Sequence, residues 1–272
     1  MESPVASPIV VGYDGSPGGR RATAWAGAVA AGRPGSVVHL VHALALPPLL
    51  PHSWERTAEE ILADAESAAR ADLETAGAGL TAAGVAVRIH LRRWLPIDTL
   101  LEAARDLGAG MLVVGQHGHR ATRLLLGSTS GAVSRVAEIP VVVVRGAERR
   151  RPPERVLLAI DGSPACRRAA LAAAAWFPHA ELVGASFRSG GEGLDDTALE
   201  EFLRGLLPPS TRFRRTSADG DPAEGLLALV ASESIDLVAA GRRGHGLLRE
   251  LLLGSVSEKL LQLADCPVLL AH

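Results

Sequence analysis

The sequence predicts an α/β fold of two tandem doubly wound domains, each with a five-stranded parallel sheet flanked by helices. A glycine-rich pattern occurs twice, which sets the number of domains at two. In each copy, short apolar runs alternate with helical stretches, which is typical of a parallel sheet with helices on both faces. Aromatic residues make up only 3% of the chain, whereas apolar residues make up 47%. We therefore expect a core of alanine, leucine and valine, with helices packed closely on the sheets.

The two copies of the glycine-rich pattern lie at 111–144 and 236–270. Each reads as an apolar run, Gly-x-x-Gly, a short segment rich in arginine and leucine, Gly-Ser, a helical stretch, a proline and a final apolar run. The stretch 9–26 also matches 156–173, so the repeat covers nearly the whole chain. The second copy is the shorter of the two.

A charged segment that contains proline separates the copies and predicts the linker. We place it at 148–153, between a first domain over 1–147 and a second over 154–272. It includes Arg149-Arg150-Arg151, the only clear basic run in the chain. With a formal net charge of −2, the protein has no basic body that would concentrate DNA or RNA. A solvated linker is therefore favoured over a nucleic-acid contact.

Each copy opens with a strand and a helix. The opening runs are wholly apolar rather than alternating, as expected of strands buried on both faces. Serine and then proline follow, the N-cap and N1 pattern that starts a helix. A long amphipathic stretch at 53–80 has a shorter counterpart at 194–207. The predicted elements are first strands at 9–13 and 156–160, helices from Ser16-Pro17 to about 32 and from Ser163-Pro164 to about 176, and second strands at 37–43 and 181–187.

The second part of each copy continues the alternation. Prolines mark the starts of helices and of the last strands, where a missing N–H group is tolerated. The predicted elements are third strands at 85–92 and 211–217, helices from Pro96 and Pro222, fourth strands at 111–115 and 237–241, helices after Ser128 and Ser255, and last strands at 141–145 and 268–271, directly after Pro140 and Pro267.

Cysteine content and hydropathy exclude several classes of protein. Cys166 and Cys266 are too few for a disulfide scaffold or a cysteine-rich metal site, and each adjoins an apolar segment, so buried thiols are expected. The N-terminus lacks a basic region followed by an apolar one, and no apolar stretch is long enough to span a bilayer. We expect a soluble, cytoplasmic protein that contacts neither membrane nor nucleic acid.

The candidate site lies where the first and fourth strands end. Ligands of a doubly wound sheet bind outside the carboxyl ends of the strands, at the point where the strand order reverses. Asp14 and Asp161 follow the first strands, and Gly115 and Gly241 end the fourth strands. If the first and fourth strands are neighbours, the aspartate and the glycine loop of each copy face the same crevice. Each aspartate could equally close the strand–helix junction as an Asx turn.

The glycine pattern has the chemistry of a phosphate site. Gly-x-x-Gly lets the backbone turn sharply and approach a ligand without a Cβ clash. Gly127-Ser128 and Gly254-Ser255 open helices, where unpaired N–H groups and the positive end of the dipole favour phosphate oxygens. The two serines could instead be ordinary N-caps. Gly-x-x-Gly and Gly-Ser occur together at matched spacing in both copies, each time after a strand. This favours a phosphate ligand over two ordinary N-caps.

These residues resemble the universal stress protein family in its tandem two-domain form, over nearly the whole chain. The family signature is Gly-x2-Gly-x9-Gly-Ser/Thr, and its nucleotide-binding branch holds ATP there. The second copy fits fully, whereas the first has eight residues rather than nine between Gly118 and Gly127. Asp-Gly-Ser-Pro after the first strand and Cys-Pro-Val-Leu or Ile-Pro-Val-Val at the end strengthen the resemblance. The missing residue either shortens the loop harmlessly or draws Gly127 away from the phosphates.

The resemblance implies roles for matching residues in both copies. The aspartates would face the nucleoside or a metal beside it, and the second strands would offer backbone to adenine. The glycines and the residues after them would wrap the ribose and phosphates. The implied set is Asp14, Val41, Gly115, Gly118, Gly127, Ser128 and Thr129 in the first copy, and Asp161, Ala185, Gly241, Gly244, Gly254, Ser255 and Val256 in the second.

Histidines and arginines in the glycine loops leave further interpretations open. His117 and His119 could begin a metal site, but no acidic third ligand stands nearby in sequence, so the metal is unknown. Arginines could pair with phosphate or simply face solvent. The residues concerned are His117, His119, His245, Arg120, Arg123, Arg242, Arg243 and Arg249.

The favoured function is ATP binding, with or without Mg²⁺ or Mn²⁺, as a stress-response switch rather than metabolic turnover. Lys259 is the only lysine and no glycine precedes it, so a Walker loop is absent, and no general base can be identified. Slow ATP hydrolysis and a nucleotide-free dimerisation scaffold with one or both sites degenerate stay open as alternatives. A flavin carrier is a further alternative, for which Tyr13 alone, an aromatic residue near a strand end that could help to hold a flavin ring, is thin support. The resemblance suggests a homodimer of tandem chains, and a switch calls for an unidentified protein partner.

Overall fold

The computed structural model describes residues 7–44, 58–116, 127–148, 150–188, 193–243 and 253–272. The order of elements is the predicted one, because apolar runs and Ser-Pro or Pro starts mark each element locally. The elements of the first half are β1 Ile9–Gly12, α1 Pro17–Ala31, β2 Val37–Ala43, α2 Ala58–Ala82, β3 Ala86–Arg92, α3 Pro96–Asp106, β4 Met111–Gly115, α4 Ser128–Val136 and β5 Val141–Val144. Those of the second half are β6 Arg155–Ala159, α5 Pro164–Trp176, β7 Glu181–Arg188, α6 Asp196–Leu206, β8 Phe213–Asp219, α7 Pro222–Ser232, β9 Leu237–Gly241, α8 Ser255–Leu263 and β10 Val268–Ala271.

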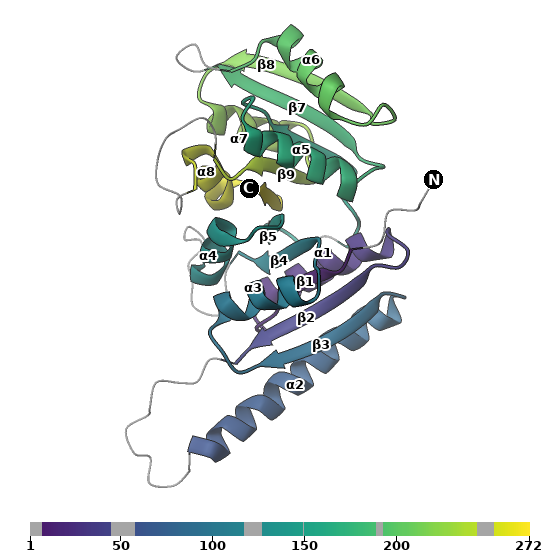
Figure 1. Cartoon of the computed structure of the whole chain (residues 1–272), viewed down its shortest axis with the longest axis vertical. Coiled ribbons are helices and arrows are strands. Elements are labelled where there is room, and N and C mark those ends of the chain that lie inside the picture. The colour runs from purple at the N-terminus through teal and green to yellow at the C-terminus, as the bar shows by residue number, and fades with distance from the viewer. Residues whose placement is uncertain (1–6, 45–57, 117–126, 149, 189–192, 244–252) are drawn as a thin grey trace.

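The strands form one continuous sheet in the order β3-β2-β1-β4-β5-β10-β9-β6-β7-β8. Within each half all neighbours are parallel, which confirms the fold class expected from the sequence. The sequence did not show that the halves share a sheet. Their last strands, β5 and β10, pair antiparallel, with Val142 opposite Leu269. Figure 1 shows this seam between the two stacked halves.

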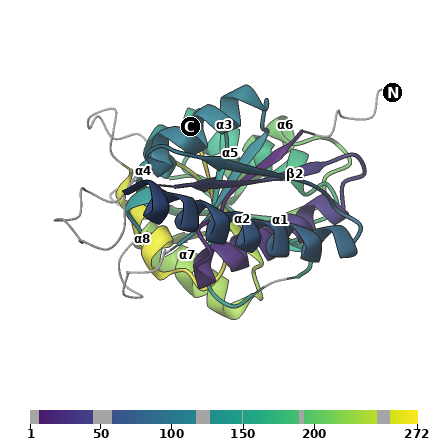
Figure 2. The same cartoon turned by 90° about the horizontal axis from the view of Figure 1, so that it is seen from below.

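Helices cover both faces of the sheet, and each face has its own core. One core contains Trp25 of α1, Leu73 of α2 and Leu203 of α6, and the other contains Leu100 of α3 and Leu260 of α8. Figure 2 shows α3 on one side of β2 and α1 and α2 on the other. All strands of the middle of the sheet are therefore buried on both faces, as their unbroken apolar runs require.

Side chains cap the helices that follow the first strands. Ser16 Oγ accepts from Gly19 N at 3.0 Å, and Ser163 Oγ accepts from Cys166 N at 3.2 Å. The Ser-Pro starts predicted from the sequence are thus confirmed as N-caps with proline in the first turn. They fix how the chain leaves each first strand, next to the candidate site.

The segment between the halves is tied to the second half by a buried carboxylate. Asp236, 4% exposed, accepts from the N–H groups of Glu154 and Arg155 at 3.0 Å each. Arg151 also reaches it at 3.5 Å while remaining 60% exposed. Arg150 pairs with Glu148 at 2.7 Å, so both described arginines of the basic run expected to be a solvated linker have an acidic partner. The domain boundaries at 147 and 154 stay a prediction.

Candidate functional site

The first and fourth strands are neighbours in both halves, as the crevice requires. Gly12 of β1 pairs with Val114 of β4, and Leu158 of β6 pairs with Ala239 of β9, both in parallel register. The carboxyl ends of these strands therefore meet at one edge. Asp14 follows the end of β1 there, beside Gly115 at the end of β4.

Both aspartates form the Asx turn that the sequence left open. Asp14 Oδ1 accepts from Ser16 N at 3.0 Å, and Asp161 Oδ1 accepts from Ser163 N at 2.9 Å. Each carboxylate thereby fixes the serine that caps the next helix. This structural role exists without a ligand. Asp14 is nevertheless exposed and Asp161 half-buried, so both remain at the surface of the carboxyl edge.

The first glycine of each motif is explained by helix packing. A Cβ on Gly115 would lie 2.4 Å from the carbonyl carbon of Gly18, in the first turn of α1. A Cβ on Gly241 would lie 2.7 Å from Cys166 N, in the first turn of α5. Both distances are shorter than real Cβ contacts allow. Glycine is required at these two positions because a helix backbone touches the strand there, whether or not phosphate binds.

The Gly-Ser pairs start nine-residue helices, but with the glycine as the N-cap. Gly127 caps α4 and Gly254 caps α8, and neither helix start has a side-chain cap hydrogen bond. Ser128 and Ser255 are the first helical residues and are exposed, so neither serine is the ordinary N-cap considered above. The first-turn N–H groups of a helix have no intrahelical partners. Each Gly-Ser thus forms a helix start at which the N-cap residue supplies no side-chain hydrogen bond.

A hydrogen bond closes each glycine motif onto the end of its fourth strand. Gly127 N donates to Gln116 O at 2.9 Å, and Gly254 N donates to Arg242 O at 2.8 Å. The two hydrogen bonds match, although the loop that each one closes is one residue shorter in the first half than in the second. The missing residue therefore does not draw Gly127 away from the strand, and its position relative to phosphate stays a prediction.

A second serine in each motif also binds the end of the fourth strand and was not singled out from the sequence. Ser130 Oγ donates to Gln116 O at 2.9 Å, and Ser257 Oγ donates to Gly241 O at 2.7 Å. Both serines are buried and both stand three residues after the N-cap glycine. The shared Gly-Ser-x-Ser spacing in the two copies was the signal that could have revealed them.

The backbone groups expected to face adenine take part in the sheet. Val41 O accepts from Tyr13 N and Ala185 O accepts from Ile160 N, each at 2.9 Å. Both residues are 1% exposed. Tyr13 is itself only 3% exposed, and burial, with a hydrogen bond to Asp72, raises its pKa to about 12. Its ring packs in the core, so it offers no open face for a flavin.

Arg242 is neither a phosphate ligand nor a solvent-facing cation, contrary to both readings of the sequence. It is 3% exposed, and its guanidinium donates to Arg135 O at 2.7 Å and to Ala137 O, at the C-terminal end of α4. The antiparallel seam brings these carbonyls to it, and a single repeat gives no sign of that contact. Several other predicted residues lie outside the described ranges: Gly118, Gly244, His117, His119, His245, Arg120, Arg123 and Arg249.

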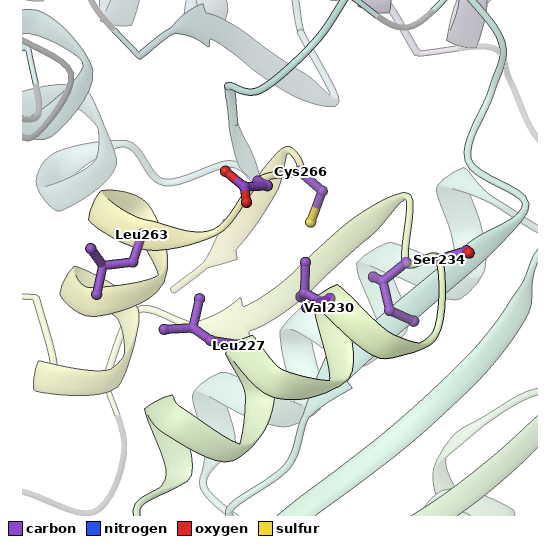
Figure 3. A pocket seen from close by; sticks show the side chains of 8 residues that line it. Leu227, Val230, Ser234, Leu263 and Cys266 are labelled. Atoms are coloured by element: carbon purple, nitrogen blue, oxygen red, sulfur yellow. The ribbon is translucent and has the colours of Figure 1, made fainter.

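A small pocket of about 190 Å³ lies away from these residues. Figure 3 shows Leu227 and Val230 of α7, Leu263 of α8, Ser234 and Cys266 around it. Ser234 and Cys266 precede β9 and β10, so the pocket opens at the amino ends of these strands, opposite the candidate edge. It gives no support to the predicted site, and the described part of its lining includes none of the predicted residues.

Neither a metal cluster nor a membrane span is found in the part of the chain that the structure describes. There, no three histidine, cysteine, aspartate or glutamate side chains lie close enough together to hold a metal ion. The described helices include none whose length and apolar character would let it cross a bilayer.

Comparison with known proteins identifies the family. The model for the universal stress protein family matches residues 6–145 and 196–272. A universal stress protein of Mycobacterium tuberculosis is 33% identical over 297 residues, covering 97% of this chain and 96% of the relative. One of Mycolicibacterium smegmatis is 32% identical over 210 residues, or 70% of each chain.

Solved structures agree at the level of the fold. A universal stress protein from Archaeoglobus fulgidus covers 98% of both chains with a TM-score of 0.71 and 17% identity. A family member solved in complex with cAMP is 28% identical and covers 52% of this chain and 98% of its own, with a TM-score of 0.40. With its doubled fold, its paired glycine motifs and these relatives, the chain belongs to the universal stress protein family.

Proposed function

We propose that each half binds ATP at the carboxyl edge of its sheet and that occupancy switches the protein between states in a stress response. The observation that carries the proposal is the pair of helix starts at Gly127-Ser128 and Gly254-Ser255, where the N-cap glycine leaves the first turn without a side-chain capping hydrogen bond. Each is hydrogen-bonded to the end of its fourth strand, at the same edge of the sheet as the turn that follows the first strand. Phosphate oxygens fit such helix starts because N–H groups and the dipole both favour them.

The remaining predicted residues complete the proposed sites. Asp14 and Asp161 lie at the rim, where a carboxylate can contact a ribose hydroxyl or a metal ion carried by the phosphates. Thr129 and Val256 contribute N–H groups in the first helical turn. The adenine base would lie beside Val41 and Ala185 of the second strands, although the carbonyls of these residues also accept hydrogen bonds from the neighbouring strand segments.

The proposal is a switch rather than a turnover enzyme. A switch requires that ATP bind the two states with unequal affinity, since a ligand shifts an equilibrium only by that difference. A protein partner that recognises one state, a homodimer of tandem chains and a cytoplasmic location belong to the same proposal. Slow hydrolysis by a positioned water is the second candidate, and a phosphate-release assay separates the two.

Calorimetry with ATP and Mg²⁺ or Mn²⁺ tests the proposal. We expect two sites per chain, and we expect Gly254→Glu to leave one, because it puts a side chain and a negative charge where phosphate would lie. Gly205→Glu is the matched control, since the Cβ of Gly205 would meet nothing within 4 Å on α6. An unchanged number of sites in Gly254→Glu would move the site elsewhere. If the protein carries no nucleotide after purification and ATP releases no binding heat, the scaffold alternative holds instead.

A further inference from the structure

Two buried arginines cross the seam between the halves in opposite directions. Arg145 follows β5 and is 6% exposed, and Arg242 follows β9 and is 3% exposed. The guanidinium of Arg145 donates to the carbonyls at the end of α8, reaching Gln262 O at 2.7 Å, Leu260 O at 3.3 Å and also Leu261 O. Arg242 does the same to the end of α4. Each half therefore supplies a cation to the C-terminal end of a helix in the other half.

The antiparallel seam explains this exchange. Because β5 and β10 run in opposite directions, the carboxyl end of each half lies beside the amino ends of the other half's last strands. The helices α4 and α8 end just before those strands and lie on either side of the seam in Figure 1. A side chain that leaves the carboxyl end of one half thus meets the last turn of a helix in the other.

Both arginines are also joined to the glycine motifs through the backbone. In the second half, Arg242 O accepts from Gly254 N, the N-cap of α8, at 2.8 Å. One chain of contacts therefore runs from the N-cap of α8 through Arg242 to the C-terminal end of α4. The N-cap of α4 is Gly127, at the other candidate site.

The return path passes through the first half. Gly127 N donates to Gln116 O at 2.9 Å, and Gln116 N donates to Val144 O at 3.0 Å. The next residue is Arg145, whose guanidinium caps α8 and so leads back to Gly254. The two paths form a closed ring that includes the starts and ends of both helices.

The electrostatics of this ring link its two ends. Aligned peptide dipoles favour an anion at a helix start and a cation at its end. Burial, followed by repulsion from Arg243 and Arg168, lowers the pKa of Arg242 to about 10, so it stays charged near neutral pH. Burial also lowers the pKa of Arg145. A buried cation must keep its partners, so movement of either helix is transmitted to the arginine that caps it.

We propose that Arg145 and Arg242 are positioning residues that couple the two nucleotide sites, so that ATP in one half tightens binding in the other. The inference rests on the proposed function. Phosphate at the start of α4 orders that helix and the carbonyls that hold Arg242, which in turn fixes the N-cap of α8. The second ligand then meets a helix start that is already ordered, which gives positive cooperativity. By reciprocity, the effect of either site on the other is the same factor.

Calorimetry measures the coupling factor. Gly127→Leu and Gly254→Leu each close one site without adding charge, and leucine is compatible with an N-cap because Leu95 occupies that position in α3. These variants give the two separate affinities, and the intact chain gives their product multiplied by the coupling factor. Allosteric coupling is typically about 5- to 150-fold, and we expect at least about fivefold tightening here.

Removing the arginines tests their part in the coupling. In Arg145→Met/Arg242→Met we expect two sites that bind independently, with a coupling factor near one. If this variant does not fold by circular dichroism, Arg145→Lys/Arg242→Lys replaces it, since a lysine keeps the charge but cannot span successive carbonyls. The expected result is again a reduced factor.

Arg33→Met is the matched control. Arg33 also joins the two halves, donating to Ala175 O at 2.7 Å and stacking 4.5 Å from the ring of Trp176. These described partners lie at the end of α5 and not in a glycine motif. The control should keep the coupling of the intact chain.

Two independent sites in the intact chain, a single site, or equal coupling in the arginine variants would overturn the inference while leaving ATP binding intact. Absence of any binding would overturn the proposed function as well.

Discussion

Gly115→Ala should destabilise the protein for a reason unrelated to nucleotide. The new Cβ would lie 2.4 Å from the carbonyl carbon of Gly18, 2.6 Å from its oxygen and 2.8 Å from its Cα. Ordinary contact begins at 3.4 Å, so α1 would have to move away from β4 by about 1 Å. Overpacking a close-packed site costs about 1–3 kcal/mol, and backbone atoms have no rotamer that could relieve it. Because the clash is with backbone, we take the upper end, about 3 kcal/mol, and subtract up to about 1 kcal/mol for a less flexible unfolded chain, which leaves a net loss of about 2 kcal/mol.

Urea denaturation followed by circular dichroism, without nucleotide, measures this loss as a fall in the free energy of unfolding. Gly79→Ala is the matched control, because a Cβ on Gly79 of α2 would meet nothing within 4 Å. Alanine favours a helix interior over glycine by up to about 1 kcal/mol, so the control should be as stable as the natural chain or more so. If Gly115→Ala unfolds at the same urea concentration as the natural chain, helix packing does not explain this glycine. Close approach of a ligand would then be the better explanation.

Three further predictions concern other parts of the chain. His39 Nδ1 lies 2.9 Å from His90 Nε2, and burial above all lowers the pKa of both imidazoles. Stability should therefore be full above the unfolded pKa of about 6.5 and decrease as pH falls below it. His39→Gln should flatten that decrease in thermal melts, and an equally steep decrease would contradict this. Leu95→Asp should supply the missing side-chain cap of α3 and add about 1 kcal/mol in urea denaturation, and an unchanged midpoint would count against it. Burial raises the pKa of Cys166 to about 11 and Cys266 is 1% exposed, so the native protein should react with a thiol reagent no faster than it unfolds, and rapid labelling would refute this.

Much of the candidate site could be predicted because its signals are local in the chain. The Ser-Pro pairs act as caps within three residues, and the Asp-Gly-Ser turns close within two. The glycine pattern gave the position of the helix starts. Which residue caps them was not predictable, since Gly-Ser permits either residue at the N-cap and only the backbone path decides between them.

By itself the sequence determined the repeat, the order of the elements and the parallel pairing within each half, because apolar runs and turn residues act over short distances. Only the tertiary structure decided that β5 and β10 join the halves into one sheet. A run of four valines in β5 is buried whether its outer edge meets a helix or another strand. Such long-range contacts also explain the residue type at Gly115 and the burial of Arg242. One is a glycine because a helix backbone touches it, and the other is buried because the opposite half supplies carbonyls for its charge.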